Sequence, residues 1–142
     1  MEERLNVDFA MVSAVESVNG LQDQIWPLQP KKNAKPPFCF YEQITDDEED
    51  ALDGLSGLQN TGFRLHIVSG GILSLSAQCA KILAAIRRMA GSSFQNEEGG
   101  SVYVEYVTAK QASPDLYDSD VGFYRRIYEV NFFYQTERSN TE

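Results

Sequence analysis

The feature that most constrains the fold is a strand pattern that leads directly into a helix pattern. Phe63, Leu65 and Ile67 alternate with polar residues, which is typical of a strand with one buried face. After residues 69–71 the apolar side chains change to helical spacing and form one stripe on a helix over 72–89. A strand and a helix that each have one apolar face must bury those faces together, so we predict an α+β protein. The stripe consists of Ile72, Leu75, Cys79, Ile82, Leu83, Ile86 and Met89.

Five other segments extend this pattern along the chain. Helical spacing of apolar residues predicts a first helix over 6–18, and the prolines of 21–37 predict an extended connector. Aromatic and β-branched residues predict strands over 38–45, 102–107 and 123–135. The expected elements therefore follow the order α-β-β-α-β-β.

This order predicts a single four-stranded sheet with two helices packed mainly on one face. A length of 142 residues suits one domain of ordinary size. We therefore expect residues 1–142 to form a single domain, with frayed ends over 1–4 and 137–142.

Two long loops are expected between these elements. The loop over 46–60 begins with five consecutive acids, whose mutual repulsion favours a solvated segment. The loop over 108–122 is much longer than the roughly 2–5 residues of a common hairpin loop. Loops of this length are often functional, so both are candidates for contacts with partners. The five acids are Asp46, Asp47, Glu48, Glu49 and Asp50.

The chain offers few side chains for catalysis or metal binding. His66 is its one histidine, and its place in a strand alternation predicts a solvent-exposed residue. Cys39 and Cys79 are expected to be free, buried thiols rather than nucleophiles or a disulfide. These three residues lack the spacing of a zinc site, and the acidic run lacks the alternation of an EF-hand loop. We therefore expect no catalytic residue, no metal site and no cofactor.

The net charge limits the partners. The formal charge is −9, from 21 acidic against 12 basic residues, and the basic pairs are short and scattered. Sequence-specific DNA binding and binding to an anionic membrane are therefore not expected. The sequence also has neither an apolar run of membrane-spanning length nor a signal-peptide pattern at its start. We expect the protein to stay in the cytosol of the cell that makes it.

Five segments, taken in their order along the chain, resemble one known family. The last of them, residues 116–126, is the most characteristic and leads into the final aromatic strand. From about Leu5 to Tyr134 the chain resembles the tail-completion, tail-terminator or head-to-tail joining proteins of long-tailed phages and prophages. The acidic segment over 46–60 is longer than the usual turn of that family. The other four segments are 25–27, 36–41, 63–68 and 82–88.

The resemblance implies a structural virion protein, made in the cytoplasm of a bacterial host, without catalytic residues. Members of this family form a ring, commonly a hexamer, at the head-proximal end of the tail tube. The ring ends tube growth and joins the tail to the head connector. The implied partners are other copies of the chain, the tail tube protein and the head connector or stopper protein. DNA is implied only to pass through, without specific binding.

A ring needs a heterologous interface, in which one patch binds a different patch on the next copy. Aromatic side chains contribute strongly to the binding energy of interfaces. The predicted interface therefore consists of aromatic residues together with two charged residues beside them. Tyr124 and Phe123 fit the strand alternation equally well as core residues. The run 46–50 is predicted to line the lumen and repel passing DNA, although solubility alone also explains its charge. The predicted interface residues are Tyr103, Tyr117, Asp118, Phe123, Tyr124 and Arg125.

Two other classes of function stay open. A non-catalytic protein-interaction domain of similar α+β shape would bind a protein partner through the aromatic strand. A small-molecule enzyme ranks last, because the chain lacks an evident base or metal-ligand set.

Overall fold

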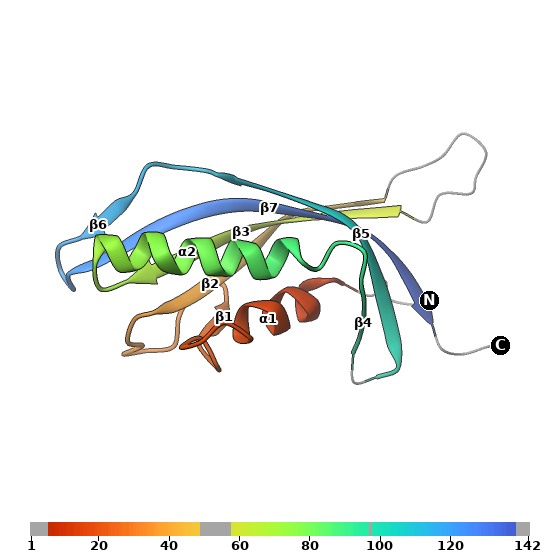
Figure 1. Cartoon of the computed structure of the whole chain (residues 1–142), viewed down its shortest axis with the longest axis horizontal. Coiled ribbons are helices and arrows are strands. Elements are labelled where there is room, and N and C mark those ends of the chain that lie inside the picture. The colour runs from red at the N-terminus through yellow and green to blue at the C-terminus, as the bar shows by residue number, and fades with distance from the viewer. Residues whose placement is uncertain (1–5, 49–57, 97, 139–142) are drawn as a thin grey trace.

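The long helix α2 (Ile72–Arg87) lies along one face of a curved sheet, and α1 (Asp8–Glu16) packs beside it (Figure 1). The computed structural model describes residues 6–48, 58–96 and 98–138, without the side chains of 46–48 and 137–138. The stripe read from the sequence is the buried face of α2, except that its first residue, Ile72, is exposed and its last, Met89, is buried just beyond the end of the helix.

Within the described residues, four long strands form the body of the sheet, and three short strands are attached to them. The long strands are β2 (Phe38–Glu48), β3 (Leu58–Ser69), β5 (Gly100–Gln111) and β7 (Phe123–Arg138). The short ones are β1 (Ile25–Pro27), β4 (Ser93–Gln95) and β6 (Leu116–Asp118). The strand order is β1-β2-β3-β7-β5-β4, and β6 pairs with β7. Only β1 and β2 run parallel among these pairs, so the sheet is mixed.

The prediction of a four-stranded sheet in the order α-β-β-α-β-β is therefore wrong. The connector over 21–37 contains β1, which aligns Ile25 with Cys39 of β2. Pro27 fits there because an edge strand does not need every backbone N–H for pairing. The segment after α2 likewise contains β4, and the loop expected over 108–122 contains β6. Each added strand covers part of an edge that a four-stranded sheet would leave unpaired.

The long strands also extend further than the sequence pattern indicated. Asp46 pairs with Thr61 and Glu48 with Gln59, so the first acids of the predicted 46–60 loop belong to β2. The backbone pairing of β2 with β3 therefore continues through a segment whose like charges favour solvation. Residues 49–57 lie outside the described part of the chain.

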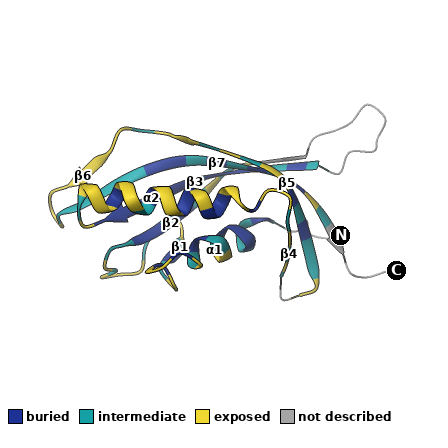
Figure 2. Cartoon of the chain, viewed as in Figure 1, coloured by how far each residue is buried: buried dark blue, intermediate teal, exposed yellow. Residues whose placement is uncertain are grey.

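The core lies between the helices and one face of the sheet (Figure 2). Phe63 of β3 and Phe132 of β7 are fully buried, and their rings meet edge to face at 5.9 Å. Thr61 and Tyr134 share a buried hydrogen bond of 2.8 Å between their hydroxyl groups, which satisfies two polar atoms inside this core.

The opposite side of the sheet, which we call the open face, carries aromatic and charged side chains. Phe40, His66 and Ile127 lie across β2, β3 and β7 in register on this face. Next to them Arg64 lies 3.3 Å from Glu42 and 4.0 Å from Glu129. Core-facing and open-face residues alternate along the strands, as the pleat requires, except at irregularities between Gln43 and Thr45 of β2 and between Val104 and Tyr106 of β5.

Candidate protein-interaction site

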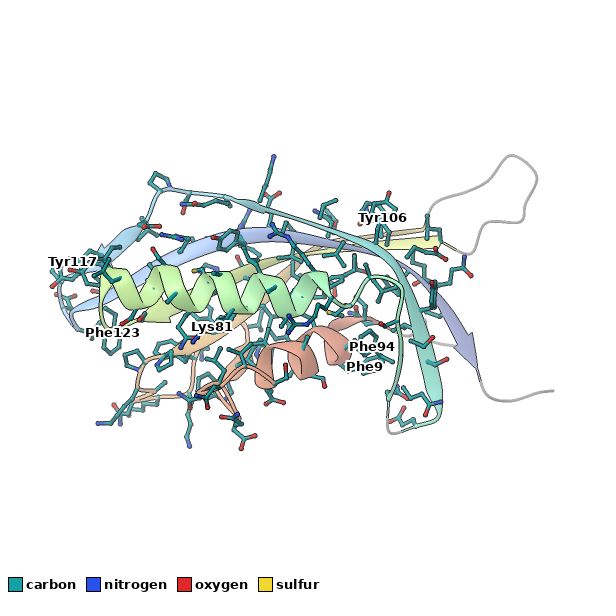
Figure 3. The ribbon with its side chains drawn as sticks, in the orientation of Figure 1. Phe9, Lys81, Phe94, Tyr106, Tyr117 and Phe123 are labelled. Atoms are coloured by element: carbon teal, nitrogen blue, oxygen red, sulfur yellow. The ribbon has the colours of Figure 1, made fainter. Side chains whose placement is uncertain are left out.

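The predicted interface residues gather mainly at one end of the molecule, where β6 folds back on the start of β7. Tyr117 lies opposite Tyr124, and Asp118 lies opposite Phe123 in the register of these two strands. Arg125 follows Tyr124 in β7. Figure 3 shows Tyr117 and Phe123 at this same end.

Tyr103 is separated from the others. It lies on β5 between Ser93 of β4 and Gln135 of β7, and so near the opposite end of β7. The structure therefore brings together five of the six predicted interface residues and leaves Tyr103 apart.

The aromatic residues at the β6 end divide between surface and core. Tyr117 is 57% exposed, and its ring lies 4.7 Å from that of the half-buried Tyr124. Tyr124 packs against the core, so it links the exposed ring to the protein interior. Phe123 is half-buried and meets Phe38 edge to face at 6.1 Å. Tyr124 is therefore partly a core residue, and the interface interpretation of these residues stays a prediction.

A pocket of about 700 Å³ opens on the open face beside these residues, and we call it the β6-end pocket. Its aromatic lining comes from Phe38 and Phe40 of β2, Tyr117 of β6 and Phe123 of β7. The loop over 30–34 lines it on one side, and β6 with the turn that follows lines it on the other. Pockets of this size commonly hold a ligand or a partner side chain. Its polar lining residues are Lys31, Asn33, Asp118, Ser119 and Arg125.

The charges in the β6-end pocket are not balanced. The Nε of Arg125 is buried and has no hydrogen-bond partner among the described residues. Lys31 is exposed at the pocket. The acid in the lining, Asp118, already accepts a hydrogen bond of 3.1 Å from the backbone N–H of Asp120. The pocket therefore has two positively charged side chains and one acid in its lining, in a strongly acidic protein.

The neighbouring Arg126 is fully engaged, in contrast to Arg125. It donates from Nε and Nη2 to Asp115 at 2.7 and 2.9 Å, and Nη2 also lies 3.3 Å from the hydroxyl of Ser76 on α2. This hydrogen-bonded pair holds the pKa of Asp115 below its usual range and raises the pKa of Arg126. The Asp115–Arg126–Ser76 link fixes the approach to β6 against both β7 and α2.

Exposed apolar side chains occur in the lining of the pocket and, separately, at the start of α2. Leu116, Tyr117 and Val121 on the β6 side are exposed, Val121 by 55%. At the start of α2, Leu73 is 84% exposed, and Ile72 is exposed as well. Figure 2 shows that both β6 and the first turns of α2 are exposed at this end. The prediction that Ile72 belongs to the buried stripe is wrong, because α2 begins at the rim of the sheet.

His66 lies under its neighbours rather than in solvent, so the prediction of an exposed residue is wrong. It is 9% exposed, and Phe40 stacks on its imidazole at 4.3 Å. Its ring nitrogens have no hydrogen-bond partner within the described chain, although Nε2 lies 3.7 Å from the Oε2 of Glu42. Burial, followed by the charge of Arg125, lowers the pKa of His66. The imidazole is therefore a neutral packing element.

Both cysteines are free and buried, as predicted. Burial raises the pKa of the Cys39 thiol strongly and that of Cys79 to about 11, so neither is a ready nucleophile. Cys39 aligns with Ile67, which is the residue after His66 on β3. The side chains of Cys39 and His66 therefore point to opposite faces of the sheet. The described ranges contain no cluster of three or more residues able to hold a metal ion. Neither described helix is long and apolar enough to cross a membrane.

The acidic run is only partly described. Asp46, Asp47 and Glu48 have backbone positions in β2, and Glu49 and Asp50 lie outside the described residues. Its predicted position in a ring lumen stays a prediction.

The pocket itself was missed by reasoning from the sequence. Phe38 and Phe40 were recognised only as strand residues, and Lys31 only as part of a connector. Their alternation with Cys39 and Tyr41 was the available signal, because it places two phenyl rings on the face away from the core. The sequence matches no model of a known protein family, and a search of curated proteins finds no match.

Proposed function

We propose that this protein is a structural virion subunit that forms a ring, commonly a hexamer in the family it resembles, at the head-proximal end of a phage tail tube. In this role the ring ends tube growth and joins the tail to the head connector, and DNA passes through without specific binding. The resemblance over about 5–134 is the source of this biological setting. The protein acts through geometry and has no catalytic step.

The observation that carries the proposal is a pair of partly free edges on the sheet. Within the described chain, β1 pairs with β2 only as far as Tyr41 and leaves the outer edge of residues 42–48 without a strand neighbour. On the other side, Ser92 bonds to the backbone of Val104, and the outer edge of β5 from residue 105 to 111 likewise has no described strand beside it. Free strand edges are templates for pairing with another chain.

These two edges are unlike and lie on opposite sides of the sheet. Pairing of the β2 edge of one copy with the β5 edge of the next gives a heterologous interface. Such an interface closes into a ring when the rotation between copies closes, and it otherwise gives an open filament. The curvature of the sheet supplies a rotation of this kind (Figure 1). The edges therefore support side-by-side assembly.

Two proline variants on β5 test edge pairing with a built-in control. Backbone N–H groups of successive residues in an antiparallel strand point to opposite sides. Of Thr108→Pro and Ala109→Pro, one therefore removes an N–H that faces β7 and the other an N–H that faces the free edge. We expect the variant that loses the N–H facing β7 to have a free energy of unfolding lower by about 1 kcal/mol or more. We expect the variant that loses the N–H facing the free edge to stay folded but fail to assemble.

Assembly is measured by size-exclusion chromatography with light scattering, for the protein alone and with purified tail tubes. A wild-type ring that the folded edge variant cannot form supports the proposal. A wild-type protein that stays monomeric in both conditions, or an edge variant that still forms rings, contradicts it. Micrographs of virions lacking the protein then identify the failed step as tails of uncontrolled length or tails left unjoined to heads.

The second candidate function is a non-catalytic interaction domain that acts as a monomer. The exposed apolar residues at the β6 end favour it, because patches of this kind mark contacts with other proteins. A monomer that ignores tail tubes but binds another protein through this end distinguishes it from the ring subunit.

A further inference from the structure

We propose that the β6-end pocket binds a segment of a second, different protein in which a carboxylate lies next to an aromatic side chain. This site is on the open face at one end of the sheet, whereas assembly is proposed to use the edges of β2 and β5. The inference therefore goes beyond the ring and can fail or hold independently of it.

The carboxylate is selected by the polar lining of the pocket. Arg125 lines the pocket and brings its positive charge there, and a guanidinium group forms its strongest hydrogen bonds with an anionic acceptor. Lys31 adds a second positive charge, and Asp118 is already engaged with the backbone of its own turn. The planar guanidinium group matches the two oxygens of a carboxylate better than a point charge does. In a chain with a net charge of −9, this local positive charge favours an acidic partner.

The aromatic group is selected by the floor of the pocket. Phe38 and Phe123 meet edge to face, and Phe40 already stacks on His66 on the same sheet face. Phe40 and Phe123 are only half-buried, so parts of both rings remain available to a ligand. A third aromatic ring can adopt the edge-to-face or offset arrangements that aromatic pairs prefer.

A protein partner fits the surroundings better than a small metabolite. A small ligand would fill the pocket but leave the apolar rim in water. That rim consists of Leu116, Tyr117 and Val121, which line the pocket with part of their surface and are 36%, 57% and 55% exposed. A protein that inserts one acidic, aromatic segment covers both the pocket and this rim. Exposed apolar patches around a pocket are typical of protein-binding sites.

N-acetylphenylalanine is the probe for this site, because it combines a carboxylate with one phenyl ring. Trp26 is the one tryptophan of the chain and contacts Phe38 at 6.1 Å between ring centroids, so its fluorescence reports on the pocket without interference from the probe. N-acetylphenylalanine amide lacks the charge, and acetate lacks the ring. We expect saturable binding of the acid, with an affinity in the millimolar range of a small fragment, and at least tenfold weaker binding of both controls.

Arg125→Gln is the diagnostic variant, and Arg64→Gln is its matched control on the same open face. We expect Arg125→Gln to weaken binding of the acid about tenfold or more while leaving the weak affinity for the amide unchanged. Arg64 already contacts Glu42 and Glu129 and lies outside the pocket lining, so Arg64→Gln should change binding by less than about twofold. Amide NMR spectra of both variants confirm that each is folded.

Three outcomes overturn the proposal. Equal binding of the acid and its amide shows that the pocket does not select a carboxylate. Equal losses in Arg125→Gln and Arg64→Gln show a general effect of surface charge. Tighter binding of a peptide that covers residues 44–53 of this chain than of N-acetylphenylalanine shows that the occupant is a second copy.

A last comparison separates this site from the edge contacts. We expect the folded β5 edge variant to bind N-acetylphenylalanine normally, and the assembly of Arg125→Gln is compared with that of wild type because Arg125 is one of the predicted interface residues. Loss of assembly in Arg125→Gln would show that the pocket is part of the contact between copies.

Discussion

At the residue scale, the buried imidazole of His66 makes the stability of the sheet sensitive to pH. The ring lies between Phe40 and the neighbouring strand residues, in a place where a proton is disfavoured by burial and by the charge of Arg125. Glu42 acts in the opposite direction, because its carboxylate lies 3.7 Å from Nε2. The net lowering of the pKa means that burial and the nearby cation dominate.

Stability is therefore expected to fall as the pH drops below about 6.5, the ordinary pKa of histidine. The unfolded chain then binds a proton at His66 while the folded chain does not. The contribution of His66 is complete above the unfolded pKa and is lost as the pH falls through the lowered, folded pKa. Urea unfolding of wild type and His66→Gln at pH values between about 5 and 8 measures this pH-dependent contribution of His66 to stability. Parallel pH profiles for the two proteins would contradict this assignment.

Gly62 gives a second prediction at this scale. A Cβ at this position would lie 2.6 Å from both the Oδ1 of Asn131 and the Oγ1 of Thr45, on the strands that flank β3. Gly62→Ala is expected to lower the free energy of unfolding by about 1–3 kcal/mol, because two side chains must move together. Gly70→Ala is the control, because a Cβ at this position would have its nearest neighbour, the Cγ of Pro36, 3.8 Å away. This variant should lower the free energy of unfolding much less. Equal unfolding midpoints for the two variants in urea would show that the strands adjust freely.

At the element scale, long periodic segments were predictable and short strands were not. The alternation of Phe63–Ile67 and the stripe over 72–89 both correspond to observed elements, because each repeats over several residues. β1, β4 and β6 have three residues each, which is too few for a pattern to emerge. Their positions depend on the neighbouring edge that they cover. The β6-end pocket was unpredictable for a related reason, since it combines segments from 30–34 to 116–125.

The short strand β6 depends on the Asp115–Arg126–Ser76 link. Asp115→Ala removes both hydrogen bonds that Arg126 donates to this carboxylate. We expect faster hydrogen exchange in β6, with a change in global stability below about 1 kcal/mol because the pair is partly exposed. Asp120→Ala removes another acid, from the turn between β6 and β7, and serves as the control. Unchanged exchange in Asp115→Ala would mean that pairing with β7 alone holds β6.

At the scale of the whole molecule, proposed functions fall on different parts of one sheet. The free edges of β2 and β5 suit side-by-side assembly, while the pocket and apolar rim lie at the β6 end. The acidic run begins at the far end of β2, since Phe38 aligns with Val68 near the pocket and Glu48 aligns with Gln59 at the other end of β3. The β6-end pocket and the acidic run thus lie at opposite ends of the long strands.

This separation leads to a prediction about DNA passage. In a ring of parallel subunits, acidic ends that face the lumen repel DNA and limit adhesion during ejection. Replacing Asp46, Asp47 and Asp50 by Asn, and Glu48 and Glu49 by Gln, should slow DNA ejection or reduce infectivity if these side chains line the lumen.

Two controls isolate the effect of position from that of charge. Light scattering first establishes that the neutralised protein still forms rings, since the change touches the β2 edge. A second variant removes five acids elsewhere, so that both proteins have the same net charge. Slower ejection only in the first variant locates the charge in the lumen, whereas unchanged ejection in both leaves solubility as the role of the acidic run. The acids replaced in the second variant are Glu2, Glu3, Glu16, Asp23 and Glu98.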